Sequence, residues 1–450
     1  MKDDNVKYNI NFLAVIFFVV FGFAKESMAA TYYVAKDGSG TFSTIQAALN
    51  AAQSGETIIV KSGTYNELIS FPRQGVVLKA MSGETVTIIQ TGRVISIDQP
   101  NIVIEGFIFD GNWGASDAVL ISSNANSLIL KNVEIKHSAR DCIDMGAPAN
   151  VLIEGSKIHD CIWFSGTTRN DAHGIVALGV KGLTIRNTEI YYVSGDAIQL
   201  QYGGWNNVLI ENCKLWNTSL PTARGGAPAG AYIGENAIDT KYYLADGRGK
   251  LDLKNITVYG WRSSGYIANA AAFNLKHNID ADVDGATCYD SEICFRVRGP
   301  GADVGGAWAT IKNAVMYNSD KAIRYEDAPE YLHLYNNIFG NNLGVFFNSA
   351  GGYGSGLDVK NNLFYGSSKP SEASHNSNIA AASGFANIAM NDYHPLDGAA
   401  WINAGIDIAE VTIDRDGNQR INGKYDIGAF EYQETLDIIP PAAPYGLSVR

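Results

Sequence analysis

Charged and amide side chains recur two residues apart in a series of short segments between residues 118 and 349. The segments align as AVLIS at Ala118, CIDMG at Cys142, GIVAL at Gly174, AIQLQ at Ala197, AIDTK at Ala237, AFNLK at Ala272, CFRVR at Cys294, AIRYE at Ala322 and VFFNS at Val345. Their third and fifth positions include Gln199, Gln201, Asp239, Lys241, Asn274, Lys276, Arg296, Arg298 and Arg324. Because side chains two apart on a strand share a face, the pattern predicts a row of polar groups facing solvent. The small first position would form its floor, and the apolar second position would face a core.

Four cations form the centre of this predicted surface. Stacked strands lie about 4.8 Å apart and alternate residues about 6.5 Å apart, which puts Lys241, Lys276, Arg296 and Arg298 in a patch roughly 10 Å on a side. Asp239 and Asn274 would lie in the same patch. Like charges at that spacing repel one another unless an anion lies among them, so the cluster favours a ligand that carries carboxylates. The alternative is an exposed strand face on which opposite charges only neutralise one another.

A second group of polar side chains stands just before these segments. Its members are Asp117, Asp141, His173, Asp196 and Asn236. His173 is either a proton carrier or a packed polar residue. Oxygen ligands on neighbouring coils suit Ca²⁺, and Asp196, Glu235 and Asn236 are close enough in the predicted stack to share an ion. Turn capping by Asp and Asn accounts for the same residues equally well.

An eight-residue repeat shows which elements would position these side chains. It reads IVIEGFIF from Ile102 and LILKNVEI from Leu128, with eight further copies down to LDVKNNLF from Leu357. Successive copies start 23 to 32 residues apart, except for one interval of 43 residues. A period in the low twenties with occasional insertions is typical of a solenoid in which each unit is one coil.

The residues inside the repeat indicate the kind of solenoid. Apolar and polar positions alternate, which is the pattern of a strand with one buried face. The fifth position holds only Gly or Asn, namely Gly106, Asn132, Gly155, Asn187, Asn212, Asn255, Gly285, Asn313, Asn336 and Asn361. These residues accept the left-handed backbone conformation that a sharp bend between two strands requires. No helical spacing separates the strands, so we predict an all-β parallel β-helix of about ten to twelve coils.

The ends of the chain predict further segments. Residues 1–29 have the apolar run and small residues of a signal peptide, and the run is too short to span a bilayer comfortably, so we expect secretion to an extracellular, periplasmic or cell-surface location. Residues 30–370 form the predicted β-helix, with an amphipathic helix from Ser43 to Ala52 capping the first coil. Residues 371–433 are interpreted as a loop and a closing segment that ends in DIGAFEY. Residues 434–450 form a Pro-rich linker that resembles the start of a truncated fibronectin type III module.

Composition narrows the partners. A net charge of −12 argues against nucleic acid or an anionic membrane as a ligand. An acidic chain that binds a polyanion must do so through a local cluster of cations. Five cysteines are too few for a disulfide scaffold, and at least one is free in a monomer. We therefore expect a monomer without stable membrane insertion whose partner is an acidic polysaccharide.

This combination of repeat and groove resembles the pectin-lyase-like superfamily of single-stranded right-handed parallel β-helices, over residues 31–370. Within that range, the segment from Glu235 to Lys241 (ENAIDTK) is similar to the Asn-Glu-Ile-Ile…Lys segment of the alginate and chondroitin lyases of polysaccharide lyase family 6. The resemblance implies that Lys241 is the catalytic base and that Glu235 or Asn236 helps to bind calcium. The order of acid and amide is reversed here, and the Arg of the following coil is replaced by Asn274 or Lys276.

The chemistry that this patch suits is β-elimination on a uronic acid. Ca²⁺, Arg296 or Arg298 would neutralise the substrate carboxylate, and Lys241, with Lys276 as the alternative, would remove the α-proton. Neighbouring ammonium groups are expected to lower the pKa of Lys241. His173 or a tyrosine would protonate the leaving oxygen. The residues expected to bind substrate are Gln199, Gln201, Asp239, Asn274, Arg298 and Arg324.

Three other functions fit the same groove. A non-catalytic carbohydrate-binding or adhesive β-helix would need only the surface. A β-helix glycoside hydrolase would use a close pair of Asp residues, and a uronate epimerase would share the proton abstraction. The Asn-Thr-Asp, Gly-His-Gly and Asp-Pro-His signatures of those enzymes are absent from the chain.

The 43-residue interval contains an insertion, residues 217–234, directly before Glu235. Its composition, rich in Gly, Ala and Pro, predicts a lid or a wall beside the groove. The aromatic residues near it in sequence are candidates for stacking on sugar rings, namely Trp205, Trp216, Tyr232, Tyr242 and Tyr243.

Overall fold

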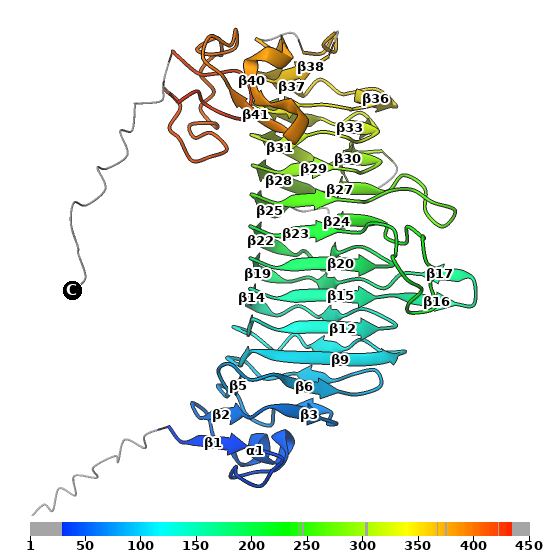
Figure 1. The fold of residues 1–450 in the computed structure, drawn as a ribbon, viewed down its shortest axis with the longest axis vertical. Helices are drawn as coiled ribbons and strands as arrows, with labels where there is room; N and C mark the ends of the chain where they lie inside the picture. The colour runs from blue at the N-terminus through cyan, green and yellow to red at the C-terminus, as the bar shows by residue number, and fades with distance from the viewer. Residues whose placement is uncertain are drawn as a thin grey trace, which may run out of the picture.

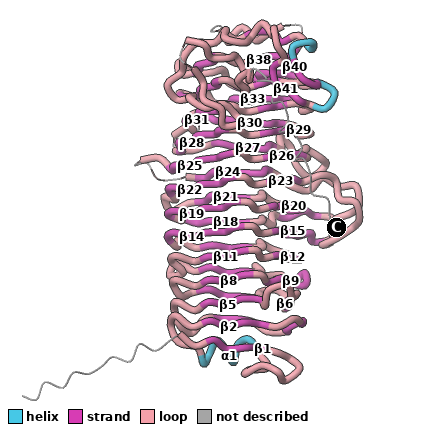
Figure 2. Tube along the Cα trace, turned by 60° about the vertical axis from the view of Figure 1, so that its left-hand side comes forward, coloured by secondary structure: helices cyan, strands magenta, loops and turns pink. Residues whose placement is uncertain are grey.

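The computed structural model describes residues 29–433 except 243, 245–246, 302–304, 367, 374–375 and 422. The predicted signal peptide, apart from residue 29, and the predicted linker of residues 434–450 lie outside the described residues. Within them the chain winds into a tall parallel β-helix whose coils stack one above another from the N-terminal to the C-terminal end (Figure 1). The same stack is seen from a second side in Figure 2.

Three parallel sheets run the length of the solenoid. Sheet A contains β1 (Thr31–Val34), β2 (Thr57–Val60), β5 (Val77–Ala80), β8 (Val103–Glu105), β11 (Ile129–Lys131), β14 (Ala149–Glu154), β19 (Lys181–Arg186), β22 (Asn206–Glu211), β25 (Gly249–Lys254), β28 (Ile279–Asp284), β31 (Trp308–Lys312), β34 (Tyr331–Tyr335) and β37 (Leu357–Lys360). Sheet B contains β3 (Gly63–Tyr65), β6 (Val86–Ile89), β9 (Phe107–Gly114), β12 (Glu134–Ser138), β15 (Lys157–Cys161), β20 (Glu189–Val193), β23 (Lys214–Trp216), β26 (Thr257–Tyr259), β29 (Thr287–Tyr289), β32 (Val315–Met316), β35 (Ile338–Phe339), β38 (Leu363–Tyr365) and β39 (Asn378–Ala380). Sheet C contains β4 (Ile69–Ser70), β7 (Ile95–Ile97), β10 (Val119–Ile121), β13 (Ile143–Met145), β18 (Ile175–Leu178), β21 (Ile198–Gln201), β24 (Asn236–Lys241), β27 (Ala271–Leu275), β30 (Ile293–Arg298), β33 (Lys321–Glu326) and β36 (Val345–Ala350).

The predicted bends are confirmed between sheets A and B. All ten Gly and Asn residues at the fifth position of the repeat have φ between +51° and +86°. That conformation turns the chain by a sharp angle at the same point of every coil, so the strands on either side stay in register. The described strands number thirteen, eleven and thirteen in the three sheets, which compares with the ten to twelve coils expected.

Both ends of the stack are covered. At the N-terminal end, helix α1 (Ile45–Ala51) buries Ile45, Ala48 and Leu49 in the core, as predicted for a cap. The Glu67 carboxylate accepts the amides of Ile45 (3.0 Å) and Gln46 (2.9 Å), which satisfies the first turn. Sheet B continues through β39, beyond the predicted boundary at residue 370.

The closing segment packs across the bends of the last coils. Asn336 Nδ2 donates to the carbonyl of Asp426 (3.0 Å), and Arg420 Nη2 donates to Asn313 Oδ1 (2.9 Å). Arg420 is fully buried and also pairs with Glu431 at 2.5 Å. The bend asparagines therefore serve twice, since they turn the chain and bind the segment that covers them.

Two details of the predicted stacking are wrong. The first position of the sheet C segments is buried rather than exposed in every coil before the last, as Ala197, Ala237 and Ala272 are all fully inaccessible. In the last coil the register is shifted by one residue. Phe347 pairs with Ile323, whose column faces the core, and so does not occupy the outward position that the alignment gave it.

Disulfides connect neighbouring elements of the coils. Cys142 is bonded to Cys161 and Cys288 to Cys294, which leaves Cys213 as the free, buried thiol. The first of these bonds joins the residue before β13 to the end of β15. It therefore fixes the start of a sheet C strand, where the polar side chains described next are located.

Candidate active site

A groove of about 430 Å³ runs over β13, β18, β21 and β24 on the outer face of sheet C. Its lining consists of Arg140, Asp141, Asp144, Asp171, His173, Val176, Leu178, Gln199, Gln201 and Lys241. Four residues predicted from the sequence are among them, namely His173, Gln199, Gln201 and Lys241. Two others, Asp196 just before β21 and Asp239 within β24, are only 1 % exposed.

A histidine between two carboxylates occupies the edge of this groove. His173 Nδ1 lies 2.8 Å from Asp141 Oδ1, and the backbone amide of His173 donates to the same oxygen at 2.8 Å. His173 Nε2 lies 3.7 Å from Asp196 Oδ2. Burial disfavours the imidazolium, but the hydrogen bond to Asp141 and the charges of Asp196 and Asp141 outweigh it and raise the pKa of His173. The three residues come from consecutive coils, so the stack itself assembles the row.

The carboxyl group of Asp196 is buried beside His173. Its Oδ1 accepts the backbone amide (3.0 Å) and the side-chain amide (2.8 Å) of Asn236. Burial, together with the charges of Asp239 and Glu235, raises the pKa of Asp196 to about 7. A carboxyl group that titrates near neutrality can exchange a proton with a substrate under ordinary conditions.

A buried carboxylate holds the two lysines of the predicted patch. Asp239 accepts from Lys276 Nζ at 3.0 Å and from Asn274 Nδ2 at 2.8 Å, and it lies 3.3 Å from Lys241 Nζ. Lys241 also donates to Gln199. Burial disfavours the ammonium of Lys241, but Asp239 and Asp196 outweigh it and raise the pKa. The expectation that cationic neighbours lower the pKa of Lys241 is therefore wrong, because its nearest charges are carboxylates.

The predicted arginines are neutralised by carboxylates of the chain itself. Arg296 makes a bidentate pair with Glu326, with both N–O distances at 3.0 Å. Arg324 pairs with the same carboxylate at 2.5 Å, and Arg298 pairs with Asp327 at 3.0 Å. The argument that these cations repel one another unless a ligand lies among them is wrong, since Glu326 occupies the centre of the cluster. None of the three arginines lines the groove.

The predicted calcium ligands lie together at the rim of the groove. The Oδ1 atom of Asn236 is buried without a hydrogen-bond partner, as an oxygen ligand to a cation would be. Two contacts argue against calcium. The Oδ1 atom of Asp196 already accepts a hydrogen bond from Asn236, and the guanidinium of Arg169 lies 3.9 Å from the carboxylate of Glu235. Among the described residues, no group of three or more His, Cys, Asp or Glu side chains is placed to hold a metal ion. The calcium site stays a prediction, with one free oxygen in its favour.

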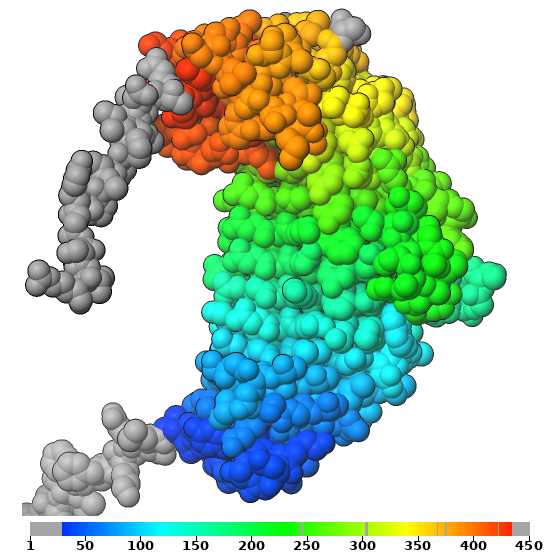
Figure 3. All heavy atoms as spheres, in the orientation of Figure 1, coloured from blue at the N-terminus to red at the C-terminus, as the bar shows by residue number. Residues whose placement is uncertain are grey.

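Three insertions, which we call the wall, leave the stack between sheets B and C, next to the sheet C strands that carry the groove. They are the hairpin of β16 (Trp163–Ser165) and β17 (Thr168–Asn170), residues 217–234, and residues 260–270. In Figure 3 the second insertion forms a raised green mass beside the hairpin, and Figure 1 shows the hairpin projecting from the stack. Arg224 pairs with Asp160 at 3.0 Å, and Arg169 Nε donates to the carbonyl of Ile233 at 2.8 Å. These anchors favour a fixed wall over a lid.

The aromatic residues predicted to stack on sugars mostly pack within the protein. Trp205 and Tyr242 are buried, and Trp216 stacks on Tyr191 with ring centroids 4.4 Å apart. Tyr243 lies outside the described residues, and the carbonyl of Tyr232 accepts from Ser264.

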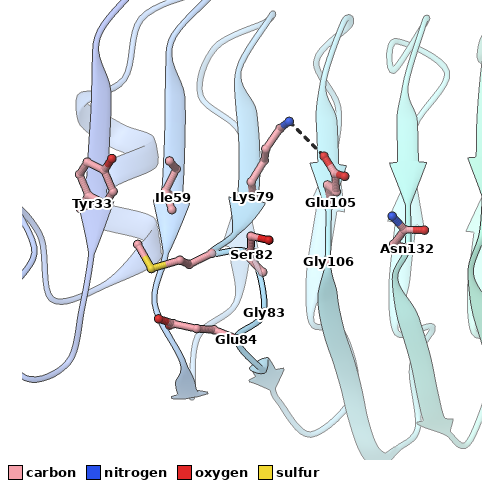
Figure 4. A pocket seen from close by; sticks show the side chains of 11 residues that line it. Tyr33, Ile59, Lys79, Ser82, Gly83, Glu84, Glu105, Gly106 and Asn132 are labelled. Atoms are coloured by element: carbon pink, nitrogen blue, oxygen red, sulfur yellow. Dashed lines mark ion pairs between the residues drawn. The ribbon is translucent and has the colours of Figure 1, made fainter. Parts of the chain in front are cut away.

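A larger hollow of about 540 Å³ lies far from this groove, near the N-terminal end of sheet A (Figure 4). Its lining includes Tyr33, Ile59 and the ion pair of Lys79 with Glu105 at 3.0 Å. Because its facing charges already neutralise each other, it offers less for chemistry than the groove on sheet C.

Sequence reasoning gave too little weight to Asp141 and did not identify Arg140 as a lining residue. A usable signal existed for Asp141, because it precedes its strand at the same point of the coil as His173 and Asp196. Asp144 has a pKa raised by burial and by the nearby charges of Asp117 and Asp141.

None of the helices in the described part of the chain is long and apolar enough to cross a membrane.

Comparison with known proteins supports the architecture. Residues 93–237 match the family model of the right-handed β-helix region. The solved structure of pectate lyase Pel9A aligns with a TM-score of 0.50 and 16% identity, over 90% of this chain and 97% of that one. A rhamnogalacturonan lyase aligns with a TM-score of 0.54 and 14% identity, over 80% of this chain and 91% of that one. No curated protein sequence matches the chain. The chain thus folds as a right-handed parallel β-helix, the fold that it shares with these two lyases.

Proposed function

We propose that this protein cleaves a uronic-acid-containing polysaccharide, such as pectate or alginate, by β-elimination in the groove on sheet C. The proposal rests on one observation: a histidine and a lysine, each held in place by a carboxylate, line the same groove. Asp141 orients His173, and Asp239 and Gln199 hold Lys241 two coils further on. The two similar folds named above belong to lyases of pectic polymers, which agrees with the proposal.

The geometry suggests roles that differ from those first assigned to the lysine and the histidine. Lys241 stays an ammonium group because of Asp239, so it suits the substrate carboxylate and makes the α-proton more acidic. In its neutral form His173 accepts that proton at Nε2, while its Nδ1–H group keeps donating a hydrogen bond to Asp141. The C–O bond then breaks, a double bond forms, and Asp196 in its protonated form supplies the proton that the leaving oxygen needs.

The test is the appearance of unsaturated products, which absorb at about 235 nm because elimination leaves a conjugated double bond. Pectate, alginate and glycosaminoglycans would be incubated with the wild-type protein and with His173→Ala, Lys241→Ala and Lys181→Ala. Lys181 is exposed on sheet A and is the matched control. Absorbance should rise with at least one polymer for wild type and the control only. No rise with any polymer would refute elimination, and full activity in Lys241→Ala would refute the assigned site.

A glycoside hydrolase is the second candidate, favoured by the carboxyl groups of Asp196 and Asp239. Burial and the nearby Asp239 raise the pKa of Asp196 to about 7, and an acid with a raised pKa near a second carboxyl group is the arrangement found in glycosidases. New reducing ends without a rise in absorbance would establish this alternative. Binding of a polymer with neither signal would indicate a carbohydrate-binding or adhesive protein.

Calcium binding by Asp196, Glu235 and Asn236 and export of the protein are part of the same proposal. Secretion would place the groove where cell-wall polysaccharides occur, and the two disulfides suit an oxidising compartment. Mass spectrometry of protein from the culture medium should find an N-terminus near residue 30. An intact leader on the active protein would contradict export through a cleaved signal peptide.

A further inference from the structure

The wall beside the groove carries an exposed indole. The chain has seven tryptophans, and among them Trp163 and Trp308 are the two with large exposed fractions, 38 % and 37 %. Trp308 is covered on its faces, since the Arg248 guanidinium lies 3.8 Å from its ring centroid and Tyr331 stacks at 5.6 Å. Trp163 has no such ring or cation against it among the described residues.

The hairpin determines which way Trp163 faces. In the β16–β17 ladder Trp163 pairs with Asn170 and Phe164 pairs with Arg169, so the two pairs lie on opposite faces. Phe164 packs into the small cluster of Ile162, Leu220, Ala227 and Ile233, which ties its face to the insertion of residues 217–234. The face of Trp163 is therefore the open one.

The base of the hairpin adjoins the groove. Asp171, which directly follows Asn170, and His173, two residues further on, both line the groove, so the chain passes from the hairpin into the groove edge. Ser194 holds both strands of the hairpin in place, because its hydroxyl accepts the amide of Trp163 (3.0 Å) and donates to the carbonyl of Asn170 (2.8 Å). Since Ser194 is fully buried, the indole is held on a rigid base.

We propose that Trp163 forms a sugar-binding subsite, in which the indole stacks on a pyranose ring of the polysaccharide that occupies the groove. The inference rests on the proposed function for the identity of the polymer, but not for cleavage. Aromatic faces bind the C–H face of a sugar ring, and a rigid aromatic side chain loses little entropy when it does so. The subsite would hold a sugar beyond the reacting one, so its contribution should appear only with longer oligosaccharides.

Binding can be measured without turnover in a His173→Ala background. Oligogalacturonates, oligoalginates and chondroitin oligosaccharides of graded length would be titrated calorimetrically. Adding Trp163→Ala should raise Kd about 3- to 10-fold for long oligomers and leave short ones unchanged, as expected for the loss of one stacking contact. Trp163→Phe should recover most of the affinity, and Trp308→Ala is the matched control.

The outcomes separate the subsite from the reaction. An unchanged Kd in Trp163→Ala, or an equal loss in Trp308→Ala, would overturn the subsite even if elimination is observed. Length-dependent loss in Trp163→Ala together with no unsaturated product would uphold the subsite and refute the lyase. Failure of every probe to bind the protein would overturn both.

Discussion

Replacing Asp196 by Asn should stabilise the fold above neutral pH while it impairs the groove. Burial and the charges of Asp239 and Glu235 raise the pKa of Asp196 from 3.8 to about 7, so the folded state resists ionisation. The corresponding stabilisation is fully present below about pH 3.8 and is lost as pH rises through 7. The difference between the two pKa values corresponds to on the order of 4 kcal/mol. Asn carries no charge, so the variant keeps what the wild type loses.

The effect should be visible in thermal unfolding. With an unfolding entropy of about 2.1 cal/mol/K per residue over roughly 400 residues, 4 kcal/mol corresponds to about 5 °C in Tm. Calorimetric melts at pH 5 and pH 9 should show a Tm advantage for Asp196→Asn that grows with pH. Asp252→Asn, on the exposed face of β25, is the control. An equal difference at both pH values, or a less stable variant at pH 9, would refute the reasoning, and retained activity would remove Asp196 from the site.

Three further predictions follow from other contacts. Arg420→Met leaves the Glu431 carboxylate buried and unpaired, which should cost about 3–5 kcal/mol and speed hydrogen exchange across residues 403–432; unchanged exchange there would contradict the role of the pair. Arg224→Ala removes the ion pair with Asp160 and the contact with a tyrosine ring, at a cost of about 1.5–3 kcal/mol. Residues 217–234 should then become sensitive to limited proteolysis, and resistance equal to that of the wild type would argue against a fixed wall. Chelation with EDTA should lower Tm and activity, with recovery on adding Ca²⁺ and not Mg²⁺, and an insensitive protein would refute the calcium site.

The architecture could be predicted from the sequence because its signals are local. Gly or Asn at one position of every repeat is enough to set the bend, and alternation of apolar residues sets the buried face. The one error of register occurs where these signals are weakest. In the last coil Val345, Phe346 and Phe347 are all apolar, so the pattern cannot decide which of them faces inward. All three are partly or largely exposed in the structure, although Phe346 and Phe347 both pack against the core.

The candidate site could be predicted in part. The repeat shows which side chains stack on one face of the sheet, but it does not show which of them form ion pairs. Asp239, Asn274 and Arg296 pair in register as the alignment indicated. Which cation meets which carboxylate depends on side-chain conformations across coils, which no sequence pattern encodes. Glu326 offered a usable signal, since it stands in the same outward column as Arg298. The hairpin that carries Trp163 was missed because it interrupts the repeat instead of obeying it.

The uniform bends have a consequence for how such a protein can change over evolutionary time. Because each strand of the three sheets pairs only with the strands above and below it, duplicating or deleting one unit would alter the groove length by a fixed step of about 4.8 Å and leave the pairing of the other strands intact. The insertions lie outside this ladder and can be exchanged separately. In the proposed function, the number of units would set how long a stretch of polysaccharide the groove can hold, and the insertions would set which polysaccharide it accepts.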